Sequence, residues 1–219
     1  VVGEHAMSHK RYDSPLTSDI EGIAKPFSHW VRTGAAAATV ALDGRDSIVE
    51  ARRAPGQVAT LILPADTAWG RGSGPVRVPA ARPRSKVSED AVRDAAASMR
   101  HGAATLLLLG DSALRAGALE HASRIAGKTG CRIMAPGANP RVERGAGRVS
   151  IERIPYPVDQ ALKVLEGVRH LVMVGAKPPV AFFGYPGKPS VTTPPGCDME
   201  ILAELHEDHA DALARLADA

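Results

Sequence analysis

The sequence is poor in the residue types that mark several common classes of protein. Only 4% of its 219 residues are aromatic, and its Lys and Arg residues are scattered among Asp and Glu, which leaves a net charge of +3. Nucleic-acid binding needs a clustered basic face or aromatic side chains that stack on bases, so we expect no nucleic-acid partner. The two cysteines, Cys131 and Cys197, are far apart in sequence. They predict free thiols in a reducing compartment rather than disulfides or a zinc site.

Long apolar runs are also missing. The longest, such as 104–109, fall far short of the roughly 20 residues that cross a bilayer. No secretory signal opens the chain either. We therefore expect no membrane partner and a cytoplasmic location. The chain begins Val-Val-Gly without an initiator Met, which suggests that residues upstream are missing.

Few helices and strands are predicted in the first 70 residues. Apolar spacing predicts a helix over 18–40 with a break at Pro26, and a second helix over 46–53 that stops at Pro55-Gly56. The apolar run 58–63 fits a strand buried on both faces. Because one such strand needs more sheet around it, we expect this half to depend on missing chain or on a partner.

A segment rich in Gly, Pro, Arg and Ser, 71–85, predicts a linker between two domains. Beyond it, helices and strands alternate, which predicts an α/β fold with a parallel sheet between helical layers. Residues 86–219 are enough for a self-sufficient domain. Helices are predicted over 89–101 (with Ser88 as N-cap), 113–128, 158–168 and 199–216, and strands over 104–109, 131–135, 149–154, 170–174 and 180–183.

Several ordered motifs run through both halves of the chain. They are Gly3-Glu-His-Ala-Met-Ser-His9, 12–20, 25–31 and 55–69 in the first half, and 106–110, 125–130, 141–147, Pro155-Tyr156, 170–176 and 179–186 in the second. These motifs resemble thiamine-diphosphate-dependent enzymes of the acetolactate synthase type. The resemblance spans nearly all 219 residues.

The resemblance implies a fold, an activity and an incomplete chain. Residues 1–70 would be the C-terminal part of the pyrimidine-binding domain, itself α/β, and 86–219 the Rossmann-like central domain. The parent enzyme would join or decarboxylate 2-oxo acids such as pyruvate, using thiamine diphosphate and Mg²⁺, as a homodimer or homotetramer. The family's activating Glu lies upstream of this chain, and no Gly-Asp-Gly for Mg²⁺ and diphosphate occurs in it. We therefore expect the isolated chain to be inactive.

The candidate catalytic residues are Glu4, His5 and His9, with Asp13 nearby in sequence. The resemblance places this loop near the active-site cleft, where His can exchange protons near neutral pH. A simple surface loop fits the residues equally well. A metal site is not expected, because His-x₃-His binds zinc only on an established helix and with a third ligand.

Cofactor-binding candidates follow two predicted strands, at the edge where parallel sheets bind ligands. They are Gly110 and Asp111 after one strand and Gly175 and Ala176 after the other. Arg141, Arg144 and Gly145 are candidates for a pyrophosphate. The resemblance implies FAD, ADP or nothing in this domain. The lack of a glycine-rich fingerprint slightly favours a charged turn.

Two further interpretations fit parts of the sequence. Gly110-Asp-Ser-Ala-Leu114 is similar to the nucleophile block of GDSL-type hydrolases, but Ala203 and His206, not Asp, stand three places before His206 and His209. A strand-to-helix turn is therefore favoured, and His206-Glu-Asp-His209 is interpreted as a solvated helix face. The other alternative is a non-catalytic nucleotide-binding or scaffold module.

Overall fold

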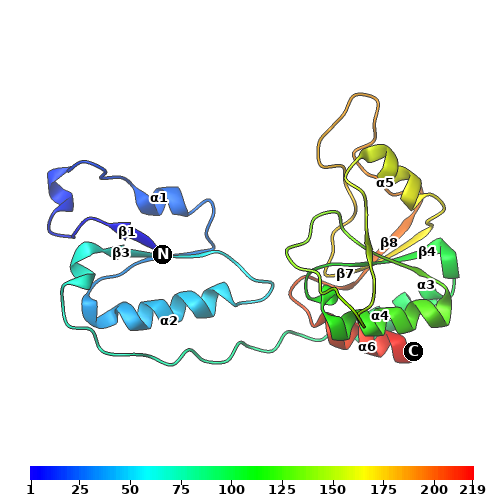
Figure 1. Ribbon diagram of the computed structural model, residues 1–219, viewed down its shortest axis with the longest axis horizontal. Helices are drawn as coiled ribbons and strands as arrows, with labels where there is room; N and C mark the ends of the chain where they lie inside the picture. Colours follow the sequence, from blue (N-terminus) through cyan, green and yellow to red (C-terminus); the bar gives the residue numbers. More distant parts are fainter. The chain divides into compact units, whose positions relative to one another are not determined.

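The computed structural model describes all 219 residues and divides into two compact units, unit 1 (Val1–Pro83) and unit 2 (Arg84–Ala219) (Figure 1). The division falls within the segment 71–85 that was expected to be a linker. All strand pairs in both units are parallel. The predicted α/β class, with a Rossmann-like parallel sheet, is confirmed.

Unit 1 is a small sheet of three strands in the order β1-β3-β2. The strands are β1 (Val2–Glu4), β2 (Trp30–Thr33) and β3 (Ala59–Pro64). The five-residue helix α1 (Ile20–Ala24) and the longer α2 (Val40–Ala51) lie on opposite sides of this sheet (Figure 1). Single 3-10 turns occur at Lys10–Tyr12, Ala37–Thr39 and Ala65–Ala68.

The predicted helix over 18–40 is wrong. Only α1 is helical there, and Trp30 and Val31 belong to β2, which pairs with β3 through Trp30↔Ala59 and Val31↔Thr60. Aromatic and β-branched side chains suit a strand, and a short apolar run does not by itself distinguish a helix from a strand. The helix predicted over 46–53 starts earlier, at Val40, and the strand predicted over 58–63 is β3.

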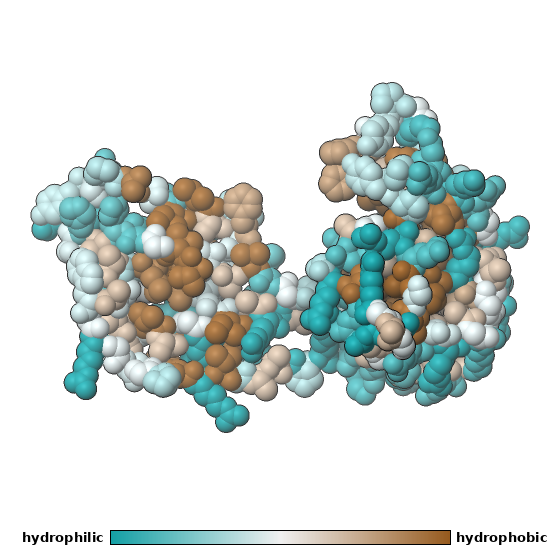
Figure 2. All heavy atoms as spheres, in the orientation of Figure 1, coloured by the Kyte–Doolittle hydropathy of each residue, from teal (hydrophilic) through white to brown (hydrophobic).

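Unit 1 buries very little apolar surface. Its buried hydrophobic residues are Ala6, Leu61 and Ile62. Large apolar side chains are exposed instead, among them Leu16 (91%), Phe27 (75%) and Trp69 (74%). Figure 2 shows broad brown surface on this unit. A sheet of parallel strands is normally covered on both faces, so unit 1 has an unusually small core.

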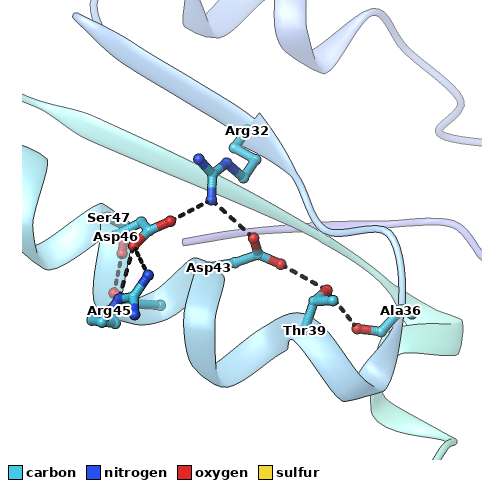
Figure 3. Close-up of polar contacts among 8 residues, drawn as sticks. Arg32, Ala36, Thr39, Asp43, Arg45, Asp46 and Ser47 are labelled. Carbon is cyan, nitrogen blue, oxygen red and sulfur yellow. Dashed lines mark hydrogen bonds and ion pairs between the residues drawn. The ribbon is translucent and has the colours of Figure 1, made fainter. Parts of the chain in front are cut away.

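Polar contacts link β2 to α2 in unit 1 (Figure 3). Arg32 Nη1 donates to Asp43 Oδ1 at 3.1 Å and to Asp46 Oδ2 at 2.8 Å. Asp43 is buried, and its Oδ2 also accepts from Thr39 Oγ1 at 3.0 Å. Hydrogen bonds from Arg32 and then Arg45 lower the pKa of Asp46. The guanidinium of Arg32 therefore balances two carboxylates, one of them buried.

Unit 2 is a five-stranded sheet in the order β6-β5-β4-β7-β8. The strands are β4 (Thr105–Leu109), β5 (Arg132–Ala135), β6 (Glu152–Arg153), β7 (His170–Val174) and β8 (Asp198–Ala203). Its helices are α3 (Glu89–Met99), α4 (Ala116–Thr129), α5 (Val158–Leu165) and α6 (His209–Asp218). The first strand in sequence lies at the centre, which places a topological switch point between β4 and β7.

The central strand β4 is buried on both faces. Leu107 and Leu109 pack into a core with α3, α4 and α6, whereas Leu106 and Leu108 pack into a core with α5. Figure 1 shows α3, α4 and α6 on one side of the sheet and α5 on the other. All five residues of β4 are 0% exposed. The continuous apolar run thus predicted the burial of this strand correctly.

Helix ends in unit 2 follow local sequence signals. Ser88 Oγ accepts from Ala91 N at 3.1 Å, as its predicted N-cap role requires. Gly130 ends α4 in the left-handed conformation, at φ 73°. No helix in the structure is long and apolar enough to span a bilayer.

Two predicted elements of unit 2 are wrong. Residues 180–183 form only an isolated bridge, Val180↔Val191, and the predicted helix 199–216 is instead the edge strand β8 followed by α6. The helical apolar spacing at Met199 and Leu202 was outweighed by pairing of β8 with β7. The strand predicted over 149–154 is reduced to the two residues of β6. Tertiary pairing, which local patterns do not show, decides such edge segments.

We predict that Arg32→Ala lowers the stability of unit 1 by about 2 kcal/mol, because it leaves buried Asp43 without its cation. Arg53→Ala is the matched control, since the Arg53–Glu50 pair is exposed and such pairs contribute little. Urea unfolding followed by tryptophan fluorescence measures this, because Trp30 and Trp69 both lie in unit 1. Equal midpoints for the two variants would contradict the prediction.

Candidate functional site

The loop after β1 brings the predicted catalytic candidates Glu4, His5 and His9 together. They line one pocket of about 600 Å³, with Leu16 and Trp69 among its other walls. The ring centroids of His5 and His9 are 5.8 Å apart, and Tyr12 lies 5.9 Å beyond His9. The pocket thus has a polar rim of carboxylate and imidazole groups beside exposed apolar side chains.

Glu4 is held in place rather than free. Its Oε2 is 3.0 Å from Lys10 Nζ, its Oε1 accepts from His5 N at 2.8 Å, and its side chain is 2% exposed. The hydrogen bond from Lys10, ahead of that from His5, holds its pKa below the ordinary value. Glu4 is therefore ionised at neutral pH and poorly suited to donate a proton.

His5 is anchored at one ring nitrogen. Its Nε2 lies 2.8 Å from the carbonyl oxygen of Pro15. Because a carbonyl only accepts, this nitrogen carries the proton in the neutral ring, and Nδ1 is left to accept. His9 has aromatic neighbours instead, and Asp13, the fourth residue of the predicted cluster, does not line the pocket.

The structure contains no group of three or more His, Cys, Asp and Glu side chains placed to hold a metal ion.

In unit 2, Gly110 and Asp111 follow β4, while Gly175 and Ala176 follow β7. These turns touch: Gly110 N donates to Val174 O at 2.9 Å, and a Cβ on Gly110 would lie 2.2 Å from Gly175 O. Gly175 has φ +59°, and a Cβ there would lie 2.3 Å from Cε1 of His209. The backbone of both turns and the His209 ring therefore fill the switch point of the sheet.

His209 is the residue whose role the sequence interpretation missed. It is 0% exposed, whereas His206 is exposed, so the expected solvated face is wrong for His209. Its Nε2 lies 2.9 Å from Glu204 O and its Nδ1 2.7 Å from Ser112 Oγ. Since Glu204 O can only accept, Nε2 carries the proton and Ser112 donates to Nδ1. No local pattern signals this contact, because it joins residues 97 positions apart.

The Ser112–His209 pair is a structural link rather than a hydrolase dyad. No carboxylate orients the ring through Nε2, which is bonded to a backbone carbonyl. Asp111 Oδ2 lies 3.8 Å from Nδ1, but it is paired with Arg84 at 3.0 Å. The contact ties the first strand-to-helix turn to α6. This agrees with the strand-to-helix turn favoured from the sequence.

The remaining cofactor candidates lie away from that turn. Arg144 and Gly145 line a pocket of about 610 Å³ near β6, together with Arg148 and Tyr156. Arg141 instead pairs with Glu143, with 3.5 Å between Nη2 and Oε1. The structure thus separates the predicted cofactor residues into a filled sheet edge and an open basic pocket.

An exposed aromatic cluster was also missed, because 180–183 was interpreted as a strand. Phe182 lies 5.5 Å from Tyr156 and 4.7 Å from Phe183, and Phe183 lies 6.4 Å from Tyr185. These are four of only eight Phe, Tyr and Trp residues (3, 3 and 2) in the chain. These residues are 43% to 70% exposed, so half of the chain's aromatic residues gather on a surface formed by two loops, one before α5 and one after β7.

Comparison with known proteins is informative over the whole chain. All 219 residues align at 44% identity with a protein named "Putative acetolactate synthase large subunit IlvX" from Mycobacterium tuberculosis. Over its full length the chain is therefore similar to a protein named as an acetolactate synthase large subunit. The chain spans 42% of the length of that relative. No family model matches this chain.

Solved structures show the same fold. The 4-hydroxybenzoylformate decarboxylase of Rhodococcus jostii RHA1, described as thiamine-diphosphate-dependent, superposes with a TM-score of 0.75 at 18% identity, and covers 98% of this chain and 44% of its own. Benzoylformate decarboxylase of Polynucleobacter necessarius gives 0.70 at 18% identity, covering 98% of this chain and 43% of its own. The predicted resemblance to thiamine-diphosphate-dependent enzymes is confirmed, from sequence by the mycobacterial relative and for the fold by these structures.

We predict that unit 2 loses stability as the pH falls below about 6.5 and that His209→Gln removes part of this dependence. Burial, the largest cause, lowers the pKa of His209 from 6.5, so the unfolded chain takes up the proton first and acid favours unfolding. His209→Gln also costs about 2 kcal/mol near neutral pH through lost buried contacts.

Urea unfolding followed by far-ultraviolet circular dichroism at about pH 7.5 and about pH 5.5 measures both effects. His206→Gln is the control, because His206 is exposed. An identical pH dependence in the wild type and His209→Gln would show that His209 does not titrate on unfolding.

Proposed function

We propose that the chain is part of a thiamine-diphosphate-dependent enzyme that acts on a small-molecule 2-oxo acid such as pyruvate, by carboligation or decarboxylation. The observation that carries this proposal is the 44% identity over all 219 residues to a protein named as an acetolactate synthase large subunit. A cytoplasmic location goes with this assignment, as does the transferase or lyase class.

Unit 1 is then the later part of the pyrimidine-binding domain, over residues 1–70, and unit 2 is the central domain, over 86–219. The sparse core of unit 1 supports this assignment. Ala6, Leu61 and Ile62 are its buried hydrophobics, and further polypeptide packed on the exposed apolar side chains would supply the missing coverage. The same need supports a homodimer or homotetramer of the intact protein.

The residues present do not by themselves fit thiamine diphosphate with Mg²⁺. No Gly-Asp-Gly occurs in the sequence, and no side-chain group is placed to hold a metal ion. In an intact enzyme the cofactor supplies carbanion chemistry. The contribution of this chain is the pocket of unit 1, where His5 and His9 would exchange protons and Glu4, paired with Lys10, would position the loop.

The alternative function is a non-catalytic module. For unit 2 this has support of its own, because backbone and His209 fill the sheet edge where a nucleotide would be expected. A scaffold role for unit 2 is compatible with an enzymatic role for the intact protein.

The proposal predicts a difference between the isolated chain and a chimera. The 219-residue chain should bind no thiamine diphosphate at micromolar concentration and form no acetolactate. Replacing the aligned region of the mycobacterial relative with this chain should restore Mg²⁺-dependent cofactor binding and turnover of pyruvate or another 2-oxo acid. Calorimetric titration and assays of CO₂ and acetolactate measure both.

The unaltered relative is the positive control for the chimera. His9→Ala in the chimera should lower turnover about 10-fold or more without lowering cofactor affinity, whereas Lys25→Ala is a matched surface control. A folded chimera that fails to bind the cofactor that its parent binds would contradict the proposal. Acetolactate formed by the isolated chain would contradict the predicted dependence on other polypeptide.

A further inference from the structure

The start of α4 is the position at which a Rossmann-like sheet usually receives a pyrophosphate. α4 follows the central strand β4, and the N–H groups of the first turn of a helix attract anions. In this chain a side-chain carboxylate is already there. Glu143 Oε2 accepts from Ala116 N, the first residue of α4, at 2.8 Å.

Glu143 is fixed by its own backbone as well. Its N–H donates to Leu114 O at 3.0 Å, so the segment around it is attached to the turn that precedes α4. Arg115, the residue before α4, makes no side-chain cap of the helix. The carboxylate of Glu143 therefore caps α4, although Glu143 lies 27 residues after Ala116 in the sequence.

Three arginines surround the carboxylate as they would surround a phosphate group. Arg148 Nη1 lies 3.2 Å from Oε2, while Arg141 Nη2 and Arg115 Nη1 lie 3.5 Å and 3.9 Å from Oε1. The bond from Ala116, then these arginines, keeps the pKa of Glu143 below its ordinary value. The group is an anion at neutral pH, and its side chain is 24% exposed.

The neighbouring crevice is closed to the rest of a dinucleotide. Gly110 and Gly175 abut, and the buried ring of His209 lies against Gly175. Asp111 adds a carboxylate at the same turn, held by Arg84 at 3.0 Å, and would repel a phosphate. The turn also lacks the second and third glycines that let a pyrophosphate approach the backbone.

We infer that unit 2 takes no FAD, ADP or other nucleotide at its sheet edge, because Glu143 is a built-in anion that occupies the phosphate position of α4. The fold keeps an anion-binding position at the start of α4, and the Glu143 carboxylate of the same chain occupies it. Unit 2 is therefore closed to nucleotides at this edge of its sheet. This inference does not depend on the reaction proposed above, since it concerns unit 2 alone.

The test uses the full 219-residue chain and three probes: inorganic pyrophosphate, ADP and FAD. The wild type should bind none of them with a dissociation constant below about 1 mM. Glu143→Ala uncovers the first N–H groups of α4 beside three cations, so its affinity for pyrophosphate should rise at least 10-fold and fall as salt is added. FAD should still not bind to this variant, because His209 and the two glycine turns remain.

Glu120→Ala is the matched control, since Glu120 is an exposed carboxylate on the same helix; it should behave as the wild type. Circular dichroism establishes that each variant is folded. Micromolar binding of ADP or FAD to the wild type would overturn the inference and needs no variant. A folded Glu143→Ala with no gain in pyrophosphate affinity would overturn the role of Glu143.

Discussion

A parallel sheet carries apolar side chains on both faces, so each face must be covered before the sheet is stable. Unit 2 meets this requirement within its own sequence. Leu107 and Leu109 of β4 face α3, α4 and α6, and Leu106 and Leu108 face α5. Unit 1 does not: in β3, Leu61, Ile62 and Pro64 are buried, while Phe27 and Trp69 elsewhere in the unit are exposed. The two units therefore differ in how completely their sheets are covered.

The contrast also separates two roles. Unit 2 is closed at its sheet edge by its own groups: His209 against Gly175, Ser112 bonded to His209, and Glu143 at the start of α4. Unit 1 is open: Glu4, His5 and His9 line a pocket whose walls include exposed Leu16 and Trp69. The catalytic role proposed above is accordingly assigned to unit 1, and the proposed scaffold role to unit 2.

The sequence predicted the central elements because their signals are local. The all-apolar run of β4 and the cap at Ser88 each specify one outcome. The family resemblance was also confirmed, because its motifs are long and occur in order along the chain. Edge strands were predicted less well: β2 and β8 were both interpreted as helix, because their place is decided by pairing with β3 and β7.

Site contacts were predictable where residues are close in sequence, or where, as at Gly110 and Gly175, they follow strands of one parallel sheet. Glu4, His5 and His9 share one loop, and the structure brings them to one pocket. Ser112 with His209, and Glu143 with Ala116, meet only because the sheet folds their elements together. Neither pair leaves a pattern in the sequence, and His209 in particular looked like part of a polar helix face.

Hydrogen exchange measured on the native 219-residue chain tests the difference in coverage most directly. The backbone amides of β4 (Thr105–Leu109) should exchange only when unit 2 unfolds as a whole. Those of β3 (Ala59–Pro64), of which Pro64 has no N–H, should exchange at least about 100-fold faster. Equal protection of β3 and β4 would show that unit 1 is as stable by itself as unit 2, and would contradict the account.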